Sequence, residues 1–287
     1  MFNKRHIVRT IAATVSILAL SFTAACGSGQ STASNSTDSD DITQQTYKPG
    51  KLTIATGQPA YEPWVMNDKP ESGEGYEAAV AYAVADKLGF KKSDVVWTRT
   101  AFDTAIAPGA KDWDFNIQQF GITDERKKAV DFSSSYYNDS QSVVVKKDSK
   151  FANATKVSDL KDATVGVMVG TLAYDYAKAN IKDDIQTFND DAALAQALDA
   201  GQIDALATST VECVYMVQSE QVKDAKVLGR LPDSEDKSGM GIVLPKDSNL
   251  TAAVTKAVDD LNADGTIKKL QDKWLAEYTT DLTELKK

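Results

Sequence analysis

The sequence predicts an α/β fold with mostly parallel sheets, because two kinds of apolar segment alternate along the chain. Short apolar runs such as 51–56 and 203–207 have the length and composition of buried strands. Longer segments such as 75–88 and 191–200 repeat their apolar residues at helical spacing, and a glycine follows directly after each of them. With 42% hydrophobic residues, the chain has enough apolar material for a sizeable core.

The same two patterns give the expected elements in order. The predicted strands cover residues 51–56, 95–99, 115–119, 143–146, 164–167, 203–207, 226–228 and 241–244. The predicted helices cover residues 75–88, 102–106, 170–180, 191–200, 211–219, 250–263 and 267–278, with a helical turn or two at 123–130. Pro108-Gly109 ends the second of these helices, and Asp264-Gly265 separates the last two.

Two strand segments about a hundred residues apart resemble each other. Residues 142–149 read SVVVKKDS and residues 241–248 read GIVLPKDS, so each is an apolar run that ends in Lys-Asp-Ser. Two interpretations stay open on spacing alone. The segments are either a pair of strands that cross between two domains or two ordinary edge strands.

The N-terminus predicts a secretory signal at residues 1–25. Lys4, Arg5 and Arg9 form a basic start, an apolar stretch at 11–22 is too short to span a bilayer, and small residues follow. Cys26 comes next, an arrangement that resembles the lipobox of bacterial lipoproteins, whose cysteine is lipidated. The alternative is an ordinary signal peptide with a coincidental cysteine. Residues 26–46 are polar, so we expect a lipidated Cys26 and a flexible tether, with the folded part beginning near residue 47.

Charge and histidine content restrict the function. Loss of residues 1–25 removes three bases and no acids, leaving 29 Lys and Arg against 41 Asp and Glu, a net charge of −12. Such a chain is not expected to bind nucleic acid. The only histidine is His6, inside the predicted signal, and Cys213 is the only cysteine besides Cys26. A histidine-based nucleophile or metal site is therefore excluded, and we expect no enzyme activity, cofactor or metal.

The segment 121–137 carries a family resemblance. It contains GITDER at 121–126, VDFS at 130–133 and two tyrosines at 136–137, which resembles a signature of family 3 periplasmic solute-binding proteins, the receptors of polar amino acid ABC importers. Further matching segments follow in the same order as in that family. They are YEPW at 61–64, GYE at 75–77, VGV at 165–167 with GT at 170–171, GQIDA at 201–205 and DGT at 264–266 with Trp274.

The resemblance covers residues 48–278 and implies a fold and a function. The implied fold is the two-lobe type II periplasmic-binding-protein fold, with residues 47–143 plus 241–287 as one lobe, 144–240 as the other and two crossing strands between them. The implied function is extracytoplasmic capture of a small carboxylate-bearing solute, above all an amino acid, by a monomeric bacterial lipoprotein that delivers it to an ABC transporter permease. The alternatives are a dehydratase-like enzyme on the same scaffold and a ligand-sensing receptor.

The resemblance also implies which residues hold the ligand carboxylate. Arg126 presents a fork of donors that matches a carboxylate, and Thr123 is placed to cap the turn that begins there. The alternative for Arg126 is a surface ion pair with Asp124, Glu125 or Asp131. Thr171 is the second carboxylate candidate, from the opposite lobe, and its alternative role is a helix N-cap.

Tyr61, Trp64 and Phe102 are expected to contact the apolar part of the ligand, with core packing as the alternative. Gln118 and Gln119 end a strand at the expected cleft and offer amide groups to a polar ligand.

Two positions depart from the family pattern, and both concern the ligand ammonium group. Ser209 stands where the family has an ammonium-binding aspartate, and Gly121 stands where it has a hydroxyl residue. A buried ammonium without acceptors is costly. Either another acid replaces them, with Glu212 or Glu77 as the candidates, or the ligand lacks a free α-ammonium. For Glu77, a solvated helix position is the alternative.

Overall fold

The computed structural model describes residues 41–279 and 282–287. The predicted signal segment and Cys26 lie outside the described residues. Within the described part, no helix has the length and apolar character needed to cross a bilayer. Cys213 lies fully buried in the core with a free thiol.

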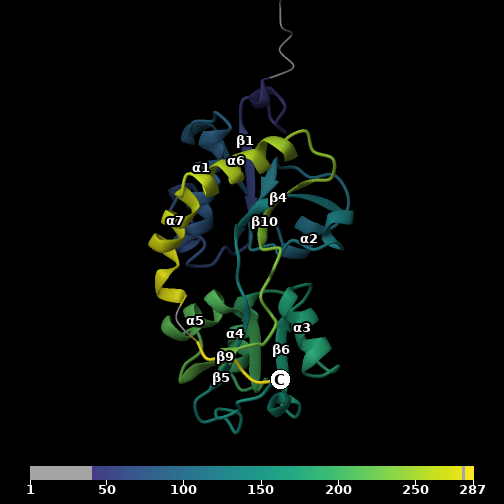
Figure 1. Ribbon diagram of the computed structural model, residues 1–287, viewed down its shortest axis with the longest axis vertical. Coiled ribbons are helices and arrows are strands. Elements are labelled where there is room, and N and C mark those ends of the chain that lie inside the picture. Colours follow the sequence, from purple (N-terminus) through teal and green to yellow (C-terminus); the bar gives the residue numbers. More distant parts are fainter. Residues whose placement is uncertain (1–40, 280–281) are drawn as a thin grey trace, which may run out of the picture. The chain divides into compact units, whose positions relative to one another are not determined.

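The described chain forms two five-stranded sheets (Figure 1). The first sheet has the order β2-β1-β3-β10-β4, and the second has the order β7-β6-β8-β5-β9. The strands of the first sheet are β1 (Leu52–Thr56), β2 (Val95–Arg99), β3 (Phe115–Asn116), β4 (Val130–Tyr137) and β10 (Met240–Pro245). Those of the second are β5 (Gln141–Lys146), β6 (Val165–Met168), β7 (Gln186–Phe188), β8 (Ala205–Ser209) and β9 (Ala225–Arg230).

One strand in each sheet runs against the other four. In the first sheet β10 is antiparallel to β3 and β4, and in the second β5 is antiparallel to β8 and β9. These two strands contain the similar segments that end in Lys-Asp-Ser, and each occupies the fourth position of its sheet. Neither is an edge strand, so that alternative is wrong. The chain passes from one sheet to the other at 138–140 and returns at 231–239.

Helices pack on both faces of each sheet, which gives the mixed α/β architecture that the sequence predicted. Ile54 and its neighbour Ala55 point to opposite faces of β1, as alternate residues of a strand must. The face with Ile54 packs against α1 (Tyr76–Lys87), α6 (Thr251–Ala263) and α7 (Thr266–Trp274), and the face with Ala55 packs against α2 (Phe102–Ile106). The second sheet lies between α3 (Leu172–Asn180) on one face and α4 (Asp191–Asp199) with α5 (Thr210–Gln218) on the other.

The structure corrects the prediction at both ends of the folded part. Residues 41–46, expected in the tether, contain a short 3-10 helix at Ile42–Gln44, and the buried Thr46 hydroxyl donates to the carbonyl oxygens of Thr43 and Lys48. Polar composition did not prevent local order there, because the segment satisfies its own backbone groups. Residues 282–287, expected in the lobe of the first sheet, hydrogen-bond to the edge of the second sheet beside Arg230, and Leu285 packs into that core.

A glycine at the start of α1 provides a test of this packing. Gly75 has φ +100°, and a Cβ there would lie 2.5 Å from the carbonyl oxygen of Trp64. We expect Gly75→Ala to lower the free energy of unfolding in urea by about 3 kcal/mol or more, because a strained backbone and a backbone clash add. The matched control is Gly89→Ala, which has φ +86° and open space around it, and should cost about 1 kcal/mol. Equal losses would contradict the packing argument.

Candidate ligand-binding site

A cavity of about 230 Å³ lies at the carboxyl ends of parallel strands from both sheets. In open α/β sheets this edge is where ligands bind. Nine of the ten predicted ligand-binding residues line the cavity, and Glu77 is the exception. Those nine are Tyr61, Trp64, Phe102, Gln118, Gln119, Gly121, Arg126, Thr171 and Ser209. Their contact with a ligand stays a prediction.

Arg126 is held by backbone carbonyl groups. Its Nη1 donates to the carbonyl oxygen of Gly121 at 2.7 Å, and its Nη2 donates to that of Gly170 at 2.8 Å. Gly121 follows β3 of the first sheet, and Gly170 follows β6 of the second sheet. The guanidinium therefore forms hydrogen bonds with one loop of each sheet. Burial lowers the pKa of Arg126, but an arginine starts from so high a pKa that the group stays charged.

The acids near Arg126 in sequence are bound elsewhere. Asp124 pairs with Lys127 at 3.5 Å, Glu125 pairs with Lys128, and Asp131 pairs with Lys246 at 3.0 Å. Among the described residues, no carboxylate forms an ion pair with Arg126. The surface ion pairs considered as the alternative role of Arg126 are therefore absent, and the carboxylates of Asp175 and Asp236 act on its charge from a distance without forming an ion pair.

The turn around Arg126 is shorter than predicted. The hydroxyl oxygen of Thr123 accepts a hydrogen bond from the Arg126 backbone N–H at 3.1 Å, as a cap would. The element that follows is a three-residue 3-10 helix, Arg126–Lys128, because β4 begins at Val130. With only one turn, a helix dipole contributes little here, and the donors of the guanidinium carry the site.

Thr171 is the N-cap of α3 and also lines the cavity. Its hydroxyl oxygen accepts from the Tyr174 N–H at 3.2 Å, and the hydroxyl donates to the carbonyl oxygen of Met168 at 2.8 Å. The hydroxyl group is thus engaged within its own loop.

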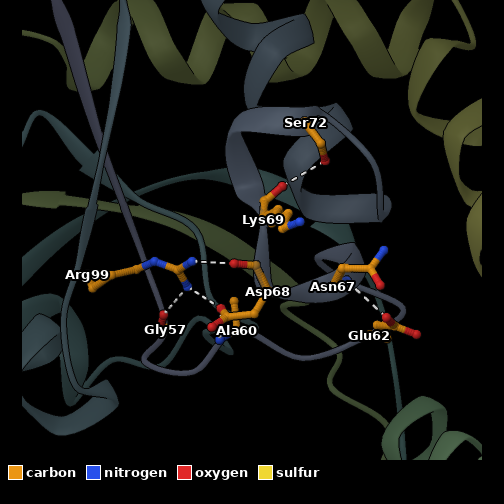
Figure 2. A network of polar contacts seen from close by, with 8 residues as sticks. All are labelled: Gly57, Ala60, Glu62, Asn67, Asp68, Lys69, Ser72 and Arg99. Atoms are coloured by element: carbon orange, nitrogen blue, oxygen red, sulfur yellow. Dashed lines mark hydrogen bonds and ion pairs between the residues drawn. The ribbon is translucent and has the colours of Figure 1, made fainter.

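The loop that carries Tyr61 and Trp64 is fastened to the first sheet by Arg99, as Figure 2 shows. The Arg99 guanidinium donates to the Gly57 carbonyl oxygen at 2.8 Å and to the Asp68 side chain at 2.5 Å. The same Asp68 carboxylate accepts from the Ala60 N–H at 2.9 Å. Gly57 and Asp68, at the two ends of this loop, therefore both bind the side chain of Arg99 at the end of β2. These contacts hold in place the part of the loop that carries the two aromatic residues.

These two aromatic residues reach the loops of the second sheet. The Tyr61 hydroxyl lies 3.4 Å from a carboxylate oxygen of Asp190, and it accepts from the Ala192 N–H at 3.3 Å. Trp64 is 1% exposed and donates from Nε1 to Glu212 at 3.0 Å. Its ring packs edge-on against Tyr76 and Tyr137, so Trp64 serves the core as well as the cavity wall.

Phe102 stands at the start of α2, half-buried. Its ring packs against that of Phe120 with centroids 4.5 Å apart, and the Arg126 guanidinium lies 5.4 Å from its centroid. A cation over an aromatic face is held by the ring quadrupole, so Phe102 helps to position Arg126.

Glu77 is a buried support rather than a solvated helix residue. It is 0% exposed, and its carboxylate accepts from the backbone N–H and side-chain amide of Gln119 and from the Tyr136 hydroxyl. Gln119 has φ +51°, so the carboxylate holds this loop in a strained backbone conformation. Burial raises the pKa of Glu77 to about 7. Since Glu77 does not line the cavity, it is not the substitute ammonium acceptor.

The neighbouring Gln118 contributes an open acceptor. Its side-chain oxygen is buried and has no hydrogen-bond partner among the described residues. Since buried polar groups are almost always paired, this amide, which lines the cavity, is available to a ligand.

The structure shows the surroundings of the two positions that depart from the family pattern. A Cβ on Gly121 would lie 2.6 Å from Leu172 Cδ1 and 2.7 Å from Asp236 Oδ2, so a side chain at this position would require both neighbouring side chains to shift. Ser209 is the N-cap of α5, where its hydroxyl oxygen accepts from the Glu212 N–H at 3.2 Å. Neither position offers a carboxylate to an ammonium group.

Other carboxylates line the cavity instead, at Asp190, Asp191 and Glu212. Glu212 was one of the two predicted substitutes, whereas sequence analysis missed the aspartates. They follow β7, a three-residue strand that the apolar pattern did not reveal, so their place at the end of a strand was not visible. Burial raises the pKa of Asp191 to about 6 and that of Glu212 well above its ordinary value, and the Asp191 carboxylate raises the Glu212 pKa further.

Comparison with known proteins shows which family the chain matches. Residues 52–277 match the family model described as bacterial extracellular solute-binding proteins, family 3. The chain is 30% identical over 223 residues to the L-cystine-binding protein TcyJ of Escherichia coli K12, covering 77% of this chain and 81% of that protein.

Two solved structures have a similar fold. An ancestral arginine-binding protein bound to arginine has a TM-score of 0.67 and 31% identity, over 78% of this chain and 98% of that one. An ancestral amino acid-binding protein, AncCDT-1, a precursor of cyclohexadienyl dehydratase, has a TM-score of 0.65 and 30% identity, over 79% of this chain and 95% of that one. These neighbours agree with the two-lobe architecture that the resemblance implied.

The buried Glu77 predicts a pH dependence of stability. Its pKa is raised from 4.5 to about 7, so the folded state holds a proton more tightly than the unfolded state, and this contribution to stability is lost as pH rises through that window. We expect Glu77→Gln to make the fall in the free energy of unfolding between about pH 4.5 and 7 shallower than in the unmodified protein. Exposed Glu74→Gln is the control and should leave the slope unchanged. Parallel curves for Glu77→Gln and the unmodified protein would contradict this prediction.

Proposed function

Because the chain belongs to the bacterial extracellular solute-binding proteins of family 3, we propose that it captures a free α-amino acid outside the cytoplasm and delivers it to an ABC importer. The relatives support this proposal, since their names describe binding of cystine and arginine. The cavity supports it as well, because it offers one guanidinium and several carboxylates to a ligand that carries both charges.

The observation that carries the proposal is the state of Arg126. Its charge lies in the cavity wall without an ion pair among the described residues, while the acids near it in sequence pair with lysines. A guanidinium has five N–H donors in a fixed fork, and the two hydrogen bonds to carbonyl oxygens leave donors free. A ligand carboxylate is the group that fits such a fork in bidentate geometry.

The proposed binding mechanism uses both parts of the chain. The segments that follow strands of the first sheet supply Arg126, Phe102 and Gln118, and those that follow strands of the second sheet supply Thr171 and Glu212. A ligand that contacts residues from both sheets stabilises the arrangement in which these two groups of residues lie close together. Capture is then a shift of population toward that closed arrangement, driven by contacts that only it provides.

We propose binding without turnover. Outside the predicted signal the chain has no histidine, and its buried carboxylates are engaged in supporting loops or in the acidic wall of the cavity. A dehydratase descends from a related binding protein, AncCDT-1, so the scaffold alone does not exclude catalysis. The arrangement of Arg126 opposite carboxylates is sufficient for retention of an amino acid.

The N-terminal features complete the proposal. A lipid on Cys26 and a polar tether would keep the binding domain near the membrane, where a permease receives the ligand.

Arg126 gives the direct test of this function. We expect Arg126→Ala to weaken amino acid binding at least about 100-fold by isothermal titration calorimetry, because the ligand carboxylate would lose its charged partner. Arg126→Lys keeps the charge but not the fork and should weaken binding at least about 10-fold. Lys127→Ala is the matched control, since it removes a neighbouring exposed cation that does not line the cavity. Unchanged affinity in Arg126→Ala would contradict the proposal.

Substitution of Cys26 tests the proposed lipid anchor. We expect the unmodified protein to sediment with membranes and partition into detergent, and Cys26→Ser to appear in the soluble extracytoplasmic fraction, because no lipid can be attached. Cys213→Ala is the control and should stay with membranes, since that thiol is buried in the core. Membrane association of Cys26→Ser would show that the anchor lies elsewhere.

A further inference from the structure

The cavity wall holds more negative than positive groups. Its ionisable residues are the Arg126 guanidinium, the carboxylates of Asp190, Asp191 and Glu212, and the Tyr61 hydroxyl, whose pKa is raised by burial so that it stays neutral. Three carboxylates thus face one guanidinium. Since the α-carboxylate of an amino acid is matched by Arg126 under the proposed function, its α-ammonium can neutralise only one of the three.

Glu212 is the most deeply buried of these acids. It is 5% exposed. Among the described residues, the side-chain donor that reaches its carboxylate is Trp64 Nε1, at 3.0 Å, and this donor carries no charge. No lysine or arginine among the described residues pairs with it. A buried carboxylate without a cation is expensive unless a partner supplies the charge.

The two aspartates extend the acidic wall along the start of α4. Asp190 accepts from the Ala193 N–H at 2.8 Å as the N-cap and lies 3.4 Å from the Tyr61 hydroxyl, and Asp191 lies 3.3 Å from the Thr208 hydroxyl. Every one of these partners is neutral. The raised pKa values of Asp191 and Glu212 agree with a cluster that lacks positive charge.

We propose that the ligand is a basic amino acid, whose two cationic groups are received by the carboxylate wall of Asp190, Asp191 and Glu212 while Arg126 holds its carboxylate. This inference rests on the proposed function and goes further, because it names the ligand class and the acceptors. Glu212 and the aspartates take over the role that Ser209 and Gly121 cannot perform. Tyr61 and Phe102 line the cavity, and their aromatic side chains suit the apolar stem of such a ligand.

The charge pattern also separates this class from others. A neutral amino acid would leave two carboxylates of the wall without a cation, and a ligand with two carboxylates would bring a second anion to a cavity that has one guanidinium. Like charges brought together in a partly buried site repel each other, and buried carboxylates without a cation are costly, so both kinds of ligand should bind less tightly.

The experiment compares ligands that differ only in one charge. Arginine and citrulline have nearly the same shape, as do lysine and norleucine, but the second of each pair lacks the side-chain cation. We expect arginine or lysine to bind at least about 30-fold more tightly than its neutral counterpart by isothermal titration calorimetry at pH 7.5. Glutamine and glutamate complete the series and should bind more weakly than the basic ligands.

Variants then assign the effect to the wall. Glu212→Gln preserves the shape and the acceptor for Trp64, and should weaken binding of the preferred basic ligand at least about 10-fold while changing the neutral counterpart less. Asp191→Asn should act in the same direction. Asp184→Asn is the matched control, because it removes an exposed carboxylate of the same region that does not line the cavity, and should leave the affinity unchanged.

The outcomes separate the inference from the function on which it rests. If neutral or acidic amino acids bind as tightly as their basic counterparts, or if Glu212→Gln and Asp191→Asn leave the preference intact, the inference is overturned and the proposed function stands. If no amino acid of any class stabilises the folded protein or gives a titration signal, both fail. A folded variant is verified in each case by an unchanged circular dichroism spectrum.

Discussion

The guanidinium of Arg126 is joined to carbonyl oxygens of two loops, one after β3 and the other after β6. That single group therefore depends on both sheets for its position, and the cavity around it exists only where the two sets of loops meet. The acids that neighbour Arg126 in sequence, Asp124 and Glu125, do not neutralise its charge, because they form ion pairs with lysines instead. A charge without an ion pair is thus maintained where a ligand can reach it.

Hydrogen bonds of two carboxylates determine the position of the loops that line the cavity. The buried carboxylate of Glu77 fixes the loop of Gln119, and the carboxylate of Asp68 fixes the loop of Tyr61 through Arg99. These acids act through backbone N–H groups, so they set the path of the chain rather than contact a ligand. Preorganised walls reduce the entropy lost on binding, which allows a small cavity to discriminate between similar solutes.

Gly121 and Ser209 offer no carboxylate to the cavity, whereas acids line it at other positions. Leu172 and Asp236 occupy the space that a side chain at position 121 would need, and the Ser209 hydroxyl caps α5. Under our proposal, the acceptors for positive charge are Glu212, one turn into that helix, and the aspartates at the start of α4. Acceptors at different positions within the same fold give different ligand preferences, because fold and site vary separately.

The sequence by itself determined the alternation of strands and helices, the family, and several of the residues that line the cavity, Arg126 and Thr171 among them. It did so because apolar periodicity reports burial, and because the GITDER segment and the segments that accompany it keep their order along the chain. Only the tertiary structure decided that Glu77 is buried support, that the last residues join the second sheet, and that Asp190 and Asp191 face the cavity. These depend on contacts between segments far apart in sequence, which a local pattern of residue types does not encode.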